Sequence, residues 1–182
     1  MIIGDGAEEL EVFYPYYRFK EEGFTVHTAA PSKKEVHTVI HERVPDWDTY
    51  IEKPGRIFPW VDKILDEVDP SEYDVAYIPG GRLPEYIRLY PKVGEILRHF
   101  MENNKIIVAV CHGGQVLAAY GLLKGKKVTG YIGIKHEVEN SGAKFIDTDV
   151  VVDGNIVTGK TWRELPSIMK EVIRVIKERT GK

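Results

Sequence analysis

Short runs of aliphatic and β-branched residues alternate along the chain with longer segments in which apolar residues recur at helical spacing. Residues 106–110, IIVAV, are the most strand-like stretch, and residues 91–104 and 165–179 are the clearest amphipathic segments. Parallel strands joined by crossover helices produce this alternation. The pattern therefore predicts an α/β fold with a mostly parallel sheet covered by helices on both faces.

Individual elements follow from the same pattern. Residues 7–23 predict a helix with Leu10, Phe13, Tyr14 and Tyr17 at helical spacing. Further strands are expected in residues 24–30 and 73–78, further helices in 113–123 and 134–142, and a hairpin at Asp153-Gly154 in residues 149–159.

Two segments fit this scheme poorly. Residues 31–72 hold prolines, tryptophans and little periodicity, which predicts an insertion of loop, one or two short strands and a short helix around residues 60–68. This insertion is a candidate pocket wall. Only MII precedes GDGAEE, so either the first strand is short or the chain starts late. We expect residues 1–182 to form one domain that contains the insertion.

Composition narrows the class of partners. A net charge of −3, from 25 basic and 28 acidic residues, leaves no basic stripe for nucleic acid. The longest apolar runs are strand-sized, so we expect no membrane segment and a cytoplasmic location. One cysteine among 182 residues excludes an internal disulfide. The chemistry considered below calls for no metal and no cofactor.

The lone cysteine, Cys111, follows the predicted strand 106–110 and precedes a helix expected to start near Gln115. Ala109 and Gly113 supply the small neighbours that a strained strand-turn-helix nucleophile elbow requires. A helix N-terminus favours a thiolate, so we expect the pKa of Cys111 to fall below its usual value. Buried packing is the alternative for a lone cysteine, but His112 and the glycines beside it favour a nucleophile.

Two other stretches place polar groups near the elbow. PGGRLPE, residues 79–85, follows a predicted parallel strand, and the N–H groups of Gly81 and His112 are candidates for an oxyanion hole. An ordinary glycine turn is the alternative there. Glu8 and Glu11 share one face at the start of the first helix and are candidates to bond the sulfur, or simple helix-capping residues.

The sequence resembles the DJ-1/PfpI superfamily over nearly its whole length. The resemblance rests on four stretches: GAEELEVFYPYYRFKEEGFTV, YDVAYIPGGRLPEYIR, VAVCHGGQVLAAYGLLKGKKVT and VVVDGNIVTG. The spacing from Gly80 to Cys111 is similar to that of PfpI-type intracellular peptidases. Two features depart from the family: Gly114 stands where proline is frequent, and GKTWRELP replaces the more usual residues after the hairpin.

The resemblance implies a flavodoxin-like three-layer sandwich that forms dimers, often assembled into hexamers. It implies Cys111 as nucleophile and His112 as base, oriented by Glu85 from a neighbouring subunit. It also implies that Glu11 lies near the sulfur, that Glu8 lies beside Glu11, and that the cleft is lined by Tyr131.

Several other side chains are candidates for metal or ligand binding. A metal site at His37 and His41 lacks a third ligand, so both are expected at the surface. A second set is either a ligand cage or packing within the insertion: Trp47, Tyr50, Phe58 and Trp60. The run FYPYY, residues 13–17, either covers a subunit contact or belongs to the core.

Three functions remain open. The leading one is a cysteine-dependent hydrolase acting on peptides, amides or carbonyl adducts such as glyoxal-modified groups. The second is a non-enzymatic stress protein or chaperone that senses oxidation at Cys111. A glutaminase subunit ranks last, because such enzymes take their histidine from a later segment and not from the position after the cysteine.

Overall fold

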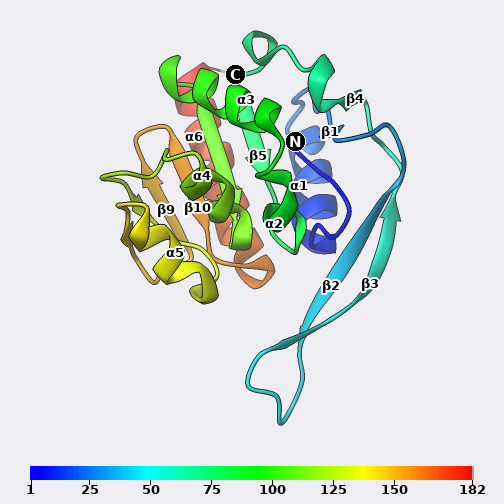
Figure 1. Cartoon of the computed structure of the whole chain (residues 1–182). Helices are drawn as coiled ribbons and strands as arrows, with labels where there is room; N and C mark the ends of the chain where they lie inside the picture. Colours follow the sequence, from blue (N-terminus) through cyan, green and yellow to red (C-terminus); the bar gives the residue numbers. More distant parts are fainter. Residues whose placement is uncertain (182) are drawn as a thin grey trace.

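The centre of the computed structural model, which describes residues 1–181, is a twisted sheet (Figure 1). Its strand order is β5-β6-β10-β9. Strands β5 (Val75–Ile78), β6 (Ile106–Val110) and β10 (Ile156–Gly159) are parallel, and β9 (Val150–Asp153) is antiparallel to β10. The predicted hairpin is confirmed, and its turn contains Gly154 with a φ of +65°.

The N-terminal residues extend this sheet beyond β5. Ile2 donates from its backbone N to the carbonyl of Tyr77, at 2.9 Å, and forms a parallel bridge to Ala29. Strand β1 (Ala29–Ala30) pairs in turn with β4 (Lys63–Ile64). The strand expected over residues 24–30 is therefore reduced to two residues, and the MII segment pairs through single bridges.

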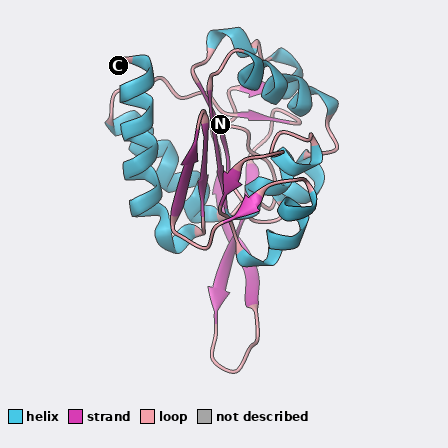
Figure 2. Ribbon diagram, turned by 90° about the vertical axis from the view of Figure 1, so that its left-hand side faces the viewer, coloured by secondary structure: helices cyan, strands magenta, loops and turns pink. Residues whose placement is uncertain are grey.

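Helices cover both faces of the sheet (Figure 2). Strand β6 shows why, because its side chains alternate between two apolar clusters: Ile107 and Ala109 belong to one, and Ile106, Val108 and Val110 to the other. The first cluster packs under α3 (Pro91–Glu102) and α4 (Gly114–Ala119), and the second under α6 (Leu165–Thr180).

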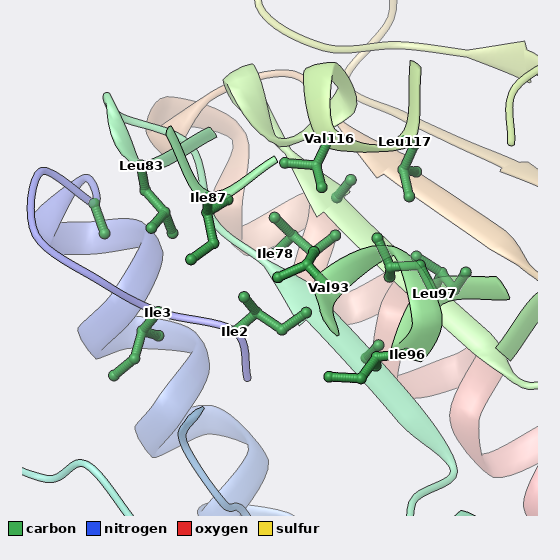
Figure 3. Packing of buried hydrophobic residues seen from close by; sticks show 14 of the residues in the cluster. Ile2, Ile3, Ile78, Leu83, Ile87, Val93, Ile96, Leu97, Val116 and Leu117 are labelled. Carbon is green, nitrogen blue, oxygen red and sulfur yellow. The ribbon is translucent and has the colours of Figure 1, made fainter. Parts of the chain in front are cut away.

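Figure 3 shows the first cluster, in which α2 (Leu83–Ile87), α3 and α4 close over β5 and the N-terminal segment. The side chains of Ile78, Leu83, Leu97 and Leu117 are fully buried there. The remaining elements lie towards one edge: the small pair β7 (Lys127–Val128) and β8 (Lys144–Phe145), and α5 (Lys135–Asn140). The fold is thus the expected three-layer α/β sandwich of the flavodoxin-like type.

Helix α1 (Glu9–Glu21) forms where predicted, but it buries a different face. Leu10, Tyr14 and Tyr17 are 47%, 38% and 53% exposed, whereas Glu11 and Tyr16 are buried. The apolar spacing misled the prediction because the buried face carries carboxylates. Tyr17 is accordingly not a core residue.

The segment 31–72 differs most from its prediction. It contains a long antiparallel hairpin of β2 (Val36–Arg43) and β3 (Tyr50–Phe58), which extends away from the body of the molecule (Figures 1 and 2). Where a short helix was expected, the chain forms β4 and a single 3₁₀ turn, Leu65–Glu67. No helix within residues 1–181 is long and apolar enough to span a membrane.

Candidate active site

The elbow is formed as its sequence predicts. Strand β6 ends at Val110, Cys111 adopts a φ of +58°, and a 3₁₀ turn, Cys111–Gly113, leads into α4. A non-glycine residue with positive φ is strained by about 1–3 kcal/mol and persists only where the surrounding structure holds it. The strain therefore marks Cys111 as a residue whose position is imposed by the fold.

The absence of a side chain at Gly80 allows Cys111, Glu11 and the main chain of His112 to come close together at the elbow. A β-carbon at Gly80 would lie 2.7 Å from Cys111 Cβ, 2.8 Å from Glu11 Oε2 and 2.8 Å from His112 N. These three atoms therefore surround one point. Any residue larger than glycine would separate the sulfur-bearing residue from the glutamate.

The environment of the thiol differs from our expectation. Cys111 is 1% exposed, and burial raises the pKa of its thiol well above the usual value. The carboxyl of Glu11 raises this pKa further, whereas the backbone N–H of His112 lowers it by donating to the sulfur. The expected low thiol pKa is therefore wrong, because burial and a nearby carboxyl outweigh the dipole of the six-residue helix α4.

His112 lies beside the sulfur, with Nδ1 3.4 Å from Cys111 Sγ. The pKa of His112 is lowered to about 4, chiefly by burial and to a smaller extent by the neighbouring His41, while Glu137 acts in the opposite direction. The imidazole is therefore neutral at pH 7 and can accept the thiol proton. The Tyr131 ring lies 4.7 Å from the His112 ring, which places Tyr131 in the wall of the site as predicted.

Glu11 and Glu8 have different roles. Glu8 caps α1 and accepts a hydrogen bond of 2.9 Å from Glu11 N. Glu11 is fully buried, and its Oε2 accepts from Gly80 N at 2.6 Å. Burial raises the pKa of Glu11 well above its usual value, and the nearby Glu8 adds to that rise. Glu11 is therefore an acid held against the thiol, and its Oε1 has no hydrogen-bond partner among the described residues.

The main chain around Gly81 leaves an amide available. Gly81 has a φ of +74° and forms an antiparallel bridge with Ala7. The hydrogen bonds of this bridge are donated by Glu8 N and Arg82 N, so the Gly81 N–H takes no part in it. This geometry is compatible with the oxyanion hole, which stays a prediction.

The β2–β3 hairpin brings a second histidine to the site. His41 is 2% exposed, so the prediction of a surface residue is wrong for it, although His37 is exposed. The His41 ring lies 6.3 Å from that of His112, and its Nε2 lies 3.0 Å from Glu52 Oε2. Tyr50 lies between the hairpin and the elbow, 4.2 Å from His41 and 6.1 Å from His112.

The aromatic residues of the hairpin segment therefore do not form one cage. Phe58 and Trp60 pack with Tyr16 at 5.2 and 5.3 Å, Tyr50 lines the active site, and Trp47 is 61% exposed at the hairpin tip. The sequence pattern did not identify His41 and Glu52 as site residues, and it gave Tyr50 only as a candidate for a ligand cage. Tyr50 and Glu52 lie close together in the TYIE sequence at residues 49–52, but only strand pairing shows that they meet His41 of β2.

Among residues 1–181, no hydrogen bond or ion pair joins Glu85 to His112. The side chain of Glu85 is 52% exposed on α2 and makes an ion pair with Arg82 at 3.5 Å. Glu137 of α5 is the carboxylate that acts on the His112 pKa, and it is held by Arg88 at 2.5 Å and Gln115 at 2.8 Å. Within residues 1–181, no group of three or more His, Cys, Asp or Glu side chains is arranged to hold a metal ion.

A three-layer sandwich with a strained cysteine on a strand-turn-helix elbow, beside a histidine and a buried glutamate, defines a class of elbow-bearing α/β proteins. Residues 1–175 match the model of the DJ-1/PfpI family, and the chain belongs to that family.

Similar proteins include "Deglycase PfpI" of Pyrococcus furiosus, which is 41% identical over 170 residues, 93% of each chain. "Putative cysteine protease YraA" of Bacillus subtilis is 34% identical over 178 residues, 97% of this chain and 96% of its own. Among solved structures, Drosophila melanogaster DJ-1beta superimposes with a TM-score of 0.79 at 26% identity, covering 100% of this chain and 89% of that one.

Proposed function

We propose that the protein is a cysteine-dependent hydrolase that removes small carbonyl adducts from amines, with Cys111 as the nucleophile. The observation that carries the proposal is the arrangement at the elbow: a strained cysteine with a neutral imidazole at 3.4 Å and the buried carboxyl of Glu11 beside it. The relative named a deglycase, 41% identical, supports carbonyl adducts as the substrate class.

The chemistry starts from a protonated thiol. As Sγ of Cys111 attacks the electrophilic carbon, the thiol proton passes to Nδ1 of His112, so no free thiolate has to exist in the buried site. His112 then gives that proton to the leaving amine. Water afterwards cleaves the S–C bond of the covalent intermediate and restores the thiol. Glu11, an acid with one oxygen free of other bonds, is placed to donate to or accept from groups attached to the sulfur.

The same step cleaves an amide, so peptidase activity remains the alternative within this reaction class. The relative named as a putative cysteine protease supports including it. Oxidation sensing is less well supported, since oxidants react with the thiolate and burial raises the pKa of this thiol.

The deciding experiment compares wild type with Cys111→Ser and His112→Gln on three substrates: methylglyoxal, methylglyoxal-treated N-acetyl-lysine and a panel of peptide-coumarin amides. Loss of a nucleophile is expected to lower turnover by about a thousandfold or more. The exposed His37→Gln is the matched control and should behave as wild type. Equal rates in wild type and Cys111→Ser on every substrate would refute the proposal.

We also propose that the protein self-associates and that Glu85 of one chain reaches His112 of another. Its half-exposed side chain on α2, which makes no hydrogen bond or ion pair with its own His112 among residues 1–181, agrees with such an arrangement. Mixing Glu85→Ala with Cys111→Ser should then restore activity that neither variant has alone. A mixture as inactive as its components would refute the cross-subunit arrangement, and full activity of Glu85→Ala alone would place Glu85 outside the reaction.

A further inference from the structure

The hairpin carries a buried histidine that the proposed chemistry does not use. His41 lies on β2 directly opposite Glu52 on β3 in the strand register, and its Nε2 meets Glu52 Oε2 at 3.0 Å. The other ring nitrogen, Nδ1, is buried and has no hydrogen-bond partner among residues 1–181. Its side chain is fully inaccessible in the single chain.

The contact with Glu52 fixes the tautomer of His41. An ionised carboxylate only accepts hydrogen bonds, so the proton of a neutral His41 ring resides on Nε2. Nδ1 is then a bare acceptor. A buried acceptor left without a donor destabilises the free protein, and a ligand with a donor group in the right place would relieve that cost.

The surroundings of the His41 ring belong to the Cys111 site. The His41 ring faces Tyr50 at 4.2 Å, Trp162 at 6.0 Å and His112 at 6.3 Å. Arg82 also lies near the His41–Glu52 pair, with its guanidinium 3.8 Å from Glu52 Oε1. Aromatic rings thus enclose the two histidines, and His112 is the one that contacts the sulfur.

We propose that His41, held by Glu52, binds the hydroxyl group of the adduct that a small 2-oxoaldehyde forms on Cys111. In that step the S–C bond forms, the C=O double bond becomes a single bond, and the thiol proton passes through His112 to the carbonyl oxygen. The product is a hemithioacetal, whose new hydroxyl donates to Nδ1 of His41. This inference rests on the proposed role of Cys111 as nucleophile and adds the residue that selects the adduct.

The chain offers a matched set of variants. His41→Gln places its amide near the Nε2 position and keeps a partner for Glu52, but it has no atom at the Nδ1 position. His41→Asn has Oδ1 bonded to Cγ, as Nδ1 is in histidine, and so restores the acceptor. His37→Gln makes the same replacement at an exposed position of the same strand.

The measurement is protection of the single cysteine. Each variant is treated with iodoacetamide at pH 8 over a series of methylglyoxal concentrations, and the alkylated Cys111 peptide is quantified by mass spectrometry. We expect the half-protecting concentration to rise about tenfold in His41→Gln, and to stay within about threefold of wild type in His41→Asn and His37→Gln.

Three results would overturn the inference: equal protection of wild type and His41→Gln, equal loss in His41→Gln and His41→Asn, or no protection of wild type. Faster alkylation of His41→Gln without methylglyoxal would also overturn it, because His41 would then act as a cover for the thiol. Protection that depends on His41 without turnover of any substrate would instead refute the proposed hydrolase and leave the binding role standing.

Discussion

The elbow and the β2–β3 hairpin build the two sides of the site in different ways. The elbow follows a strand that is buried along its whole length and pairs with β5 and β10 on both sides. The hairpin pairs only with itself over most of its length. Its base is packed in the core through Phe58, whereas Trp47 at its tip is exposed.

Cys111 and His41 are therefore held in position in two different ways. At the elbow, neighbouring strands on both sides hold Cys111 in a strained conformation. In the hairpin, a cross-strand pair positions His41, and the strength of anchoring falls from the base towards the tip. One side of the site is thus positioned by the central sheet, and the other side is positioned by the β2–β3 hairpin alone.

The largest expected effect tests whether the hairpin base is a true part of the core. Phe58 packs against Phe13, Tyr16 and Trp60 with ring separations of 5.2 Å each. Phe58→Ala should lower the free energy of unfolding by about 3–5 kcal/mol, measured by urea denaturation. Its neighbour Ile57, 47% exposed, is the control, and Ile57→Ala should cost less than about 1 kcal/mol. Equal costs would show that the hairpin base is not anchored in the core through Phe58.

A second test addresses the packing at the elbow. Gly80→Ala inserts a methyl group within 2.8 Å of Glu11 Oε2 and His112 N, and should cost about 1–3 kcal/mol and slow turnover at least tenfold. In Gly114→Ala the new methyl meets the flexible end of Ile134 at 3.1 Å and Val138 at an ordinary contact distance of 3.7 Å, so stability and turnover should change little. Normal turnover in Gly80→Ala would mean that the elbow is not tightly constrained.

A third test uses the buried carboxylate next to the elbow. Burial raises the pKa of Glu8 from 4.5 to about 7, so between these values the folded chain keeps a proton that the unfolded chain has released. Stability should therefore fall as pH rises through this window, by on the order of 2 kcal/mol for Glu8 alone.

Glu8→Gln removes this titration. The difference in free energy of unfolding between Glu8→Gln and wild type should shift in favour of the variant from pH 4.5 to 7, and then level off. Parallel pH profiles for the two proteins would show that Glu8 is not a strained buried acid.

The smallest effect is expected at the hairpin tip. Trp47→Ala should change the free energy of unfolding by no more than about 0.5 kcal/mol, because the side chain is 61% exposed. The rate of Cys111 alkylation should also be unchanged. A loss above about 1 kcal/mol would show that the tip is anchored and would end the contrast drawn between the ends of the hairpin.

The elbow could be predicted because its determinants are local. A buried strand, a cysteine between small residues and a following helix lie within ten consecutive positions, so the order of residues alone places Cys111 and His112 together. The resemblance to the DJ-1/PfpI superfamily implied that Glu11 lies near the sulfur, whereas its position in the first helical turn alone left helix capping as the alternative.

The features that could not be predicted depend on contacts between residues that are distant in the sequence. The pKa of Cys111 has the opposite direction to the expected one, because burial and Glu11 act through space. The contact of His41 with Glu52 depends on strand register across an eleven-residue separation, which no local pattern reveals. The buried face of α1 could not be predicted either, because the helical spacing of Leu10, Tyr14 and Tyr17 does not reveal that these side chains are exposed.

The crowding around Gly80 constrains how this protein can diversify. Any side chain added at Gly80 displaces the reacting groups themselves. A mutation there therefore abolishes catalytic activity before it can change substrate specificity. Substitutions in the β2–β3 hairpin change which groups can approach Cys111 and leave the surroundings of its thiol intact. New substrates are therefore expected to be acquired through changes in the hairpin, while the elbow stays the same.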